Sequence, residues 1–193
     1  MSNGLAEGLR VMFMFGHVMT MVYAGITMTA CHHAIFRYEQ MRSGLLLRSA
    51  QATMMAILAH WISGLLVLAF DTGFSWQLIA RQPLLLSKIT VMGILTLKTV
   101  VFYKFALPRL VGIKRDVRGS QGPIAMLGVM SVSSWVYLVF LGVAKPLLGL
   151  GYGGFMALYG GVMLLAAGFA WRVVGPRIRW AHQHAKTIIG YTM

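Results

Sequence analysis

The amino-acid sequence predicts an all-α integral membrane protein, a single bundle of five transmembrane helices. Of its 193 residues 58% are hydrophobic and only 11% are charged. Soluble domains carry about 45–50% apolar and about 25% charged residues, so this chain has too little polar sequence to cover a globule. It also contains five apolar runs that are bounded by charged residues. One cysteine, Cys31, has no partner for a disulfide, which excludes a disulfide scaffold.

The first two spans are expected at residues 11–35 and 51–70. A helix needs about 20 apolar residues to cross a hydrocarbon core about 30 Å thick, and both runs have about this length or more. The first begins after Arg10 and ends before Arg37, and the second ends before Asp71. Unbroken apolar runs favour helices over a β-barrel, in which polar and apolar residues alternate.

The remaining spans are expected at residues 84–107, 124–144 and 155–174. The third contains two lysines, Lys88 and Lys98, and a glycine-rich loop separates the fourth from the fifth. Prolines stand before the third and fourth spans and after the fifth, where a missing backbone donor does least harm. These are Pro83, Pro123 and Pro176.

The distribution of basic residues predicts the orientation in the membrane. Twelve fall on one side of the expected spans: Arg37, Arg42, Arg48, Lys104, Arg109, Lys114, Arg115, Arg118, Arg172, Arg177, Arg179 and Lys186. The other side has Arg10, Arg81 and Lys145. The positive-inside rule then places the amino terminus outside and the carboxyl terminus in the cytoplasm, with residues 175–193 as a basic cytoplasmic tail. The net charge of +13 is thereby explained by topology, and we expect no nucleic-acid partner.

Four ionisable residues fall inside the expected spans: His17, His60, Lys88 and Lys98. Such residues cost about 2.5–3.5 kcal/mol at the centre of a membrane helix, so they are functional candidates by default. Two histidines on different helices at comparable depth suit axial ligation of a haem. We therefore expect haem b as the cofactor and His17 and His60 as ligands of its iron. Thr20 and Ser63 are candidates to orient these rings, although both hydroxyls have the spacing for bonds to their own backbone.

Each of these residues also has a purely structural explanation. A histidine in a membrane span can simply join two helices by a hydrogen bond. Lys88 can extend towards the outer surface, and Lys98 can bond across helices or line a water-filled cavity. Met14, Met21 and Met28 repeat every seven residues, and their soft thioethers make copper a lower-ranked alternative to haem.

The sequence also resembles a known superfamily over residues 11–110. The similar positions are His17 with Ala24 and Gly25, Trp76 near the end of the second span, the run from Leu84 to Ile89 that contains Lys88, and the run from Leu107 to Leu110. This pattern is similar to the superfamily that includes the copper-resistance protein D membrane domain and the HemJ-type protoporphyrinogen oxidases. The resemblance implies haem b and activity associated with His17 and Lys88. Tyr23 stands near the place of an expected tryptophan, and a later tyrosine–histidine pair is absent.

Taken as a whole, the sequence predicts a multi-pass protein of the bacterial inner membrane that binds haem b and transfers electrons. We expect it to work as a subunit or partner of a quinone-linked or periplasmic redox system, in a homo- or hetero-oligomer. If Lys88 rather than His60 is the second ligand, the resemblance favours porphyrinogen oxidation. The further alternatives are a copper-transport protein and a cofactor-free accessory subunit, so the sequence does not decide whether the chain is an enzyme.

Overall fold

The structure, a computed structural model, describes residues 2–36, 43–110 and 121–174. These residues form helices and short connections, without strands, and five of the helices are long and apolar enough to cross a membrane. The prediction of an all-α chain with five helices of membrane-spanning character is confirmed to that extent. The expected basic tail, residues 175–193, lies outside the described residues.

The five long helices are α1 (Ser2–Phe36), α2 (Ser43–Thr72), α4 (Pro83–Val101), α6 (Gln121–Val143) and α7 (Gly151–Phe169). Most begin several residues before the expected apolar run. An apolar run marks the part of a helix that lies in hydrocarbon, whereas the backbone hydrogen bonds continue into the polar flanks. The sequence therefore located the spans but not the helix ends.

Short helical segments complete the fold. They are α3 (Trp76–Ala80), the π-helical segment Phe102–Ala106, α5 (Leu107–Leu110), the 3-10 segment Lys145–Leu150 and the π-helical segment Ala170–Val174. The two π segments extend α4 and α7 without a break in the chain's helical course. None of these segments was expected, because each is too short to produce a periodic pattern.

Local chemistry accounts for the reversal between α2 and α4. Gly73 follows α2 with a positive φ of 56°, the usual conformation after the last helical residue. Phe74 also has a positive φ, 59°, which is unfavourable for a residue with a bulky side chain. Pro83 then begins α4 at a position where its missing N–H has no helical partner to lose.

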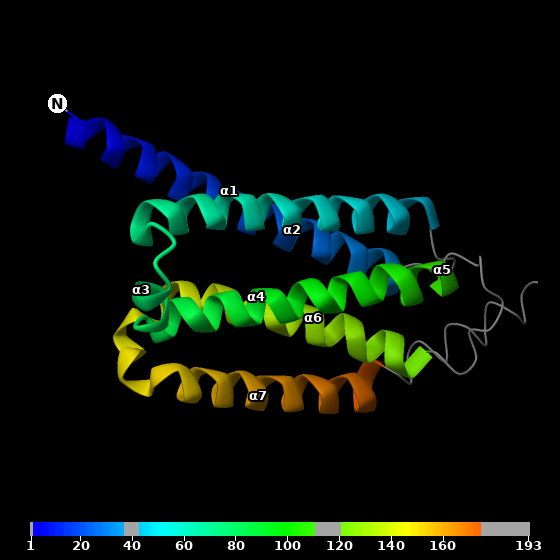
Figure 1. The fold of residues 1–193 in the computed structure, drawn as a ribbon. Coiled ribbons are helices and arrows are strands. Elements are labelled where there is room, and N and C mark those ends of the chain that lie inside the picture. Colours follow the sequence, from blue (N-terminus) through cyan, green and yellow to red (C-terminus); the bar gives the residue numbers. More distant parts are fainter. Residues whose placement is uncertain (1, 37–42, 111–120, 175–193) are drawn as a thin grey trace, which may run out of the picture.

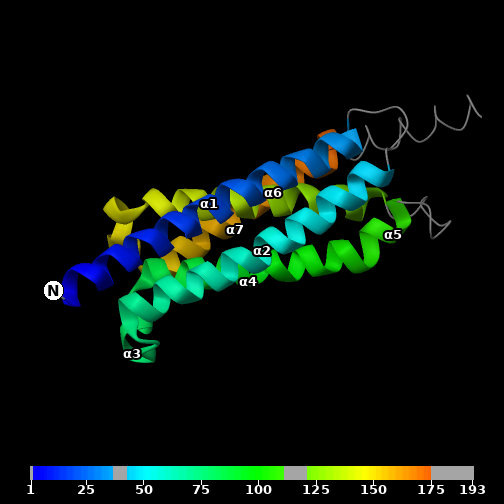
Figure 2. The same ribbon diagram turned by 90° about the horizontal axis from the view of Figure 1, so that it is seen from above.

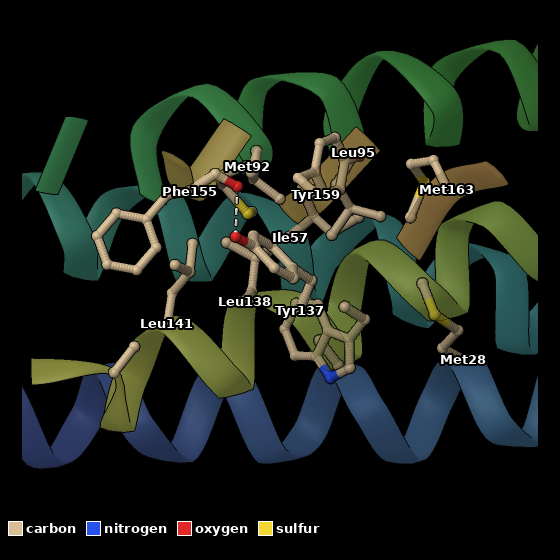
Figure 3. Packing of buried hydrophobic residues seen from close by; sticks show 14 of the residues in the cluster. Met28, Ile57, Met92, Leu95, Tyr137, Leu138, Leu141, Phe155, Tyr159 and Met163 are labelled. Atoms are coloured by element: carbon tan, nitrogen blue, oxygen red, sulfur yellow. Dashed lines mark hydrogen bonds between the residues drawn. The ribbon is translucent and has the colours of Figure 1, made fainter. Parts of the chain in front are cut away.

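The long helices fall into two groups (Figures 1 and 2). Helices α1 and α2 pack closely against one another, and α4, α6 and α7 pack among themselves. A buried apolar cluster joins the groups, with members from all five long helices. Figure 3 shows its centre, where the Tyr137 hydroxyl donates to the carbonyl of Phe155 at 2.6 Å. A second link is the indole N–H of Trp61 on α2, which donates to Thr96 on α4 at 2.9 Å.

Apart from Lys88 and Lys98, the basic residues of the described chain lie at the two ends of the bundle. The end at which α1 begins also carries α3 and the turn between α6 and α7 (Figure 1), and it holds Arg10, Arg81 and Lys145. The opposite end holds Arg48, Lys104, Arg109 and Arg172. The other eight basic residues assigned to that side lie outside the described residues. This division of the basic residues between the two ends agrees with a chain of five helices that run in alternating directions.

Candidate functional site

The imidazole rings of His17 and His60 lie face to face between α1 and α2. Their centroids are 4.0 Å apart and their planes differ by 19°. His60 is buried and His17 is half-buried. The structure thus brings together the two histidines that the sequence singled out, although they are 43 residues apart.

Two hydroxyl groups hold this pair in a crossed arrangement. Nδ1 of His17 lies 3.0 Å from the Ser63 hydroxyl on α2, and Nδ1 of His60 lies 3.0 Å from the Thr20 hydroxyl on α1. Each hydroxyl also donates to a carbonyl of its own helix, Thr20 to His17 and Ser63 to His60. The sequence left open whether these side chains orient the histidines or bond to the backbone, and in the structure they do both.

Two glycines make room for this cluster. A Cβ atom at Gly64 would lie 3.1 Å from Cε1 of His17, and one at Gly25 would lie 3.0 Å from Nε1 of Trp135. Trp135 itself meets His60 edge to face, with centroids 5.8 Å apart. Gly64 and Gly25 could leave space for a flat cofactor ring, but here they accommodate protein rings, His17 and Trp135 respectively.

Lys88 lies near the same site, as the sequence predicted from its depth. It is half-buried on the second turn of α4, close enough to His17 and Lys145 for an electrostatic effect. In the described part of the chain no hydrogen bond to its ammonium group is found. Three of the four ionisable residues of the spans, His17, His60 and Lys88, therefore gather in one region.

The chemistry of the donors fits haem iron, whereas the spacing of the rings limits how haem can bind. Because the hydroxyls occupy Nδ1 in both rings, Nε2 is the nitrogen through which either ring would coordinate a metal. Two axial imidazoles lie on opposite faces of a macrocycle and point their nitrogens at its iron. Rings stacked at 4.0 Å are in van der Waals contact and leave no space for a macrocycle between them. As arranged, the pair fits one axial ligand with a second ring packed against it.

Four aromatic residues could wall a bound haem, Trp61, Phe70, Trp76 and Trp135, and three of them lie elsewhere. Trp61 bonds to Thr96, Phe70 packs against Phe13 with centroids 5.4 Å apart, and Trp76 on α3 is exposed. Trp135 alone among them contacts the histidine pair in the described structure. The sequence could not show which of these aromatic residues contacts the histidines, because this depends on how each helix is rotated about its axis.

Lys98 forms a second polar cluster, between α4, α6 and α7. Its amino group donates to Ser134 at 2.8 Å, to Tyr159 at 3.1 Å and to the Met163 sulfur at 3.3 Å. Ser134 and Tyr159 are themselves 2.9 Å apart. The interhelical hydrogen bond, one of the two roles considered for Lys98, is the one observed. Its partners were missed, although Tyr159 and Met163 are four residues apart and hence share a helix face.

The features considered for copper do not converge. Met14 is exposed, while Met28 belongs to the buried apolar cluster. Among the described residues, no three His, Cys, Asp or Glu side chains lie together so as to hold a metal ion.

Comparisons of the chain with protein-family models, curated proteins and solved structures found no significant match.

Proposed function

We propose that the chain is a multi-pass membrane protein that binds haem b and takes part in electron transfer. The single observation that supports this function is the His17–His60 pair, in which imidazoles from two helices meet inside an apolar bundle. Ionisable side chains are rare in membrane spans and mark functional sites by default. Two histidines that meet, with their Nδ1 atoms held by hydroxyl groups, indicate a functional site more strongly than either histidine alone.

In this proposal Nε2 of one imidazole would hold the iron, and the other imidazole would stay packed against the face of the first. A bound haem supplies one-electron redox chemistry, and the chain supplies the ligand, an apolar surround and charge compensation. Lys88, half-buried on the second turn of α4, is the cation that would neutralise a propionate carboxylate. The redox partner would be a quinone-linked or periplasmic system at the bacterial inner membrane.

The test is an absorption spectrum of the detergent-purified protein before and after reduction with dithionite, together with a pyridine haemochrome assay. We expect a sharp reduced α-band and about one haem per chain, as one axial site allows. His17→Gln and His60→Gln serve as controls for each other. With one axial ligand, one variant loses the haem and the other retains it with an altered spectrum. The proposal would be contradicted if both variants kept the full haem content, or if the unsubstituted protein were folded but colourless.

One observation favours a second candidate, a cofactor-free accessory subunit. The crossed contacts of Thr20 and Ser63 satisfy both rings from within the α1–α2 pair, as an interhelical lock would. This candidate predicts a colourless protein that co-purifies with a larger assembly. It also predicts that His17→Gln and His60→Gln lower the thermal stability of the haem-free protein by similar amounts.

A further inference from the structure

The polar contacts between α1 and α2 repeat one short pattern twice. A histidine is followed three residues later by a hydroxyl side chain, His17 by Thr20 and His60 by Ser63. Each hydroxyl bonds to the carbonyl of the histidine on its own helix, at 2.8 Å for Thr20 and 3.0 Å for Ser63. Each also contacts Nδ1 of the histidine on the other helix, at 3.0 Å in both cases.

A count of protons assigns the direction of the four shorter bonds in this cluster, which also contains a longer contact of 3.4 Å between the two hydroxyl oxygens. A hydroxyl has one proton, and a carbonyl oxygen can only accept. The protons of Thr20 and Ser63 therefore lie in the contacts to the carbonyls, where two oxygens 2.8 or 3.0 Å apart require a proton between them. In the contacts to the rings the hydroxyl oxygens must then accept. Nδ1 of His17 and Nδ1 of His60 must both carry a proton.

We infer that Thr20 and Ser63 are positioning residues that fix both imidazoles as Nδ1–H tautomers and reserve both Nε2 lone pairs for a ligand. A neutral imidazole has one protonated nitrogen, so Nε2 is the basic nitrogen of each ring. The site therefore suits a ligand that accepts an electron pair, such as a metal ion. Its identification as haem iron rests on the proposed function, whereas the tautomers are a property of the chain itself.

The tautomers are measured first, by nitrogen-15 NMR of the haem-free, full-length protein in detergent, with labelled histidine. The other four histidines, His32, His33, His182 and His184, are replaced by glutamine so that two rings remain. At a pH at which these are neutral, we expect protonated Nδ1 and unprotonated Nε2 in both rings. A protonated Nε2 in either ring of this otherwise unsubstituted protein would overturn the inference.

Substitution of the hydroxyls tests the crossed assignment. Thr20→Val removes the acceptor of His60, and Ser63→Ala removes that of His17, so each should change the tautomer of the ring on the opposite helix alone. Thr20→Ser and Ser63→Thr keep the hydroxyl and should restore the original signals. Thr27→Val is the matched control, because the Thr27 hydroxyl bonds to the carbonyl of Ala24 in the same manner. A change at the ring of the same helix, or an equal change in the Thr27 variant, would contradict the assignment.

A second readout joins the inference to haem. Loss of a residue that orients a metal-binding histidine typically lowers metal affinity about 10–100-fold, so whichever of Thr20→Val and Ser63→Ala frees the ligating ring should weaken haem binding by that factor. The conservative variants should restore it. If the protein binds no haem, the proposed function fails while the NMR result still decides the tautomers. If haem binds equally well to all variants, the positioning role fails and the proposed function stands.

Discussion

At the scale of single residues, Lys98 shows how a charged side chain is accommodated inside the bundle. The Ser134 hydroxyl donates its proton to the carbonyl of Met130 at 2.7 Å, so its oxygen accepts from Lys98. With Tyr159 and the Met163 sulfur as further acceptors, the three protons of an ammonium group each have a partner. No carboxylate takes part among the described contacts of this group. Neutral acceptors therefore take the place of water around the charge.

This arrangement predicts that removal of Ser134 is costly only while Lys98 is present. Ser134→Ala should lower the free energy of unfolding by about 1–3 kcal/mol, because it leaves a buried ammonium proton without a partner. In a Lys98→Met background the same substitution should cost much less. Ser131→Ala is the control, since Ser131 lies on the same helix, donates to the carbonyl of Leu127 and contacts no charge. Unfolding in detergent measures all four variants, and equal losses in both backgrounds would disprove the coupling.

The same residue scale explains what sequence could reveal of the candidate site. His17, His60, Lys88 and Lys98 stood out because ionisable residues in apolar runs are expensive. Their partners did not stand out, because Ser134 and Thr20 resemble many other small polar residues of membrane helices. Which hydroxyl faces which ring depends on how the helices are rotated about their axes. A buried hydroxyl that bonds to its own backbone costs little free energy, so it does not stand out in the sequence.

At the scale of elements, the packing of α1 against α2 and α6 depends on glycine where rings approach the backbone. Gly64 faces His17, and Gly25 faces Trp135 of α6. A salt bridge between Arg10 and Asp71, 2.6 Å long, joins α1 and α2 at the end of the bundle where α1 begins. Both of its side chains are substantially exposed, so it contributes to the relative placement of the helices more than to stability.

The glycine contacts predict opposite effects for two similar substitutions in α1. Gly25→Ala places a Cβ 3.0 Å from the Trp135 indole and should destabilise the bundle by about 1–3 kcal/mol, the usual cost of overpacking. Gly16→Ala meets no atom within 4 Å, so it should be neutral or stabilise by up to about 1 kcal/mol through helix propensity. Thermal unfolding of both variants in the same detergent makes the comparison. An equal loss in both would show that the space beside Trp135 is not filled as described.

Sequence was most informative about elements that depend only on the order of residues along the chain. The five long helices follow from hydrophobic length, and the start of α4 follows from Pro83. The short helix α3 and the π-helical ends of α4 and α7 do not, since they arise where the chain packs against neighbouring helices. The stacking of His17 on His60 is of the same kind, because similar depth in the membrane does not specify how close two rings lie.

At the scale of the whole molecule, the two helix groups set the surroundings of the candidate site. The histidine pair belongs to α1 and α2, while Trp135 contacts it from α6 and Lys88 lies near it on α4. The Lys98 cluster lies within the other group, α4, α6 and α7. In the described structure these two polar clusters therefore lie in different groups of helices. A substitution in the Lys98 cluster should leave the tautomers of the histidine pair unchanged.

The separation of basic residues between the ends of the bundle predicts the orientation of the entire chain. The end with more of them should face the cytoplasm, because translocation of Lys and Arg across the membrane is disfavoured.

Two exposed positions report on the two ends, Gln77 on α3 and Gly44 at the start of α2. In a Cys31→Ser background, Gln77→Cys should react with a membrane-impermeant maleimide in intact cells whose outer membrane has been opened. Gly44→Cys should react only after the inner membrane is permeabilised. The background variant should stay unlabelled throughout. The reverse pattern would invert the orientation, and labelling of both cysteines from the same side would contradict the alternation of spans, since α2 connects the two positions with a single crossing.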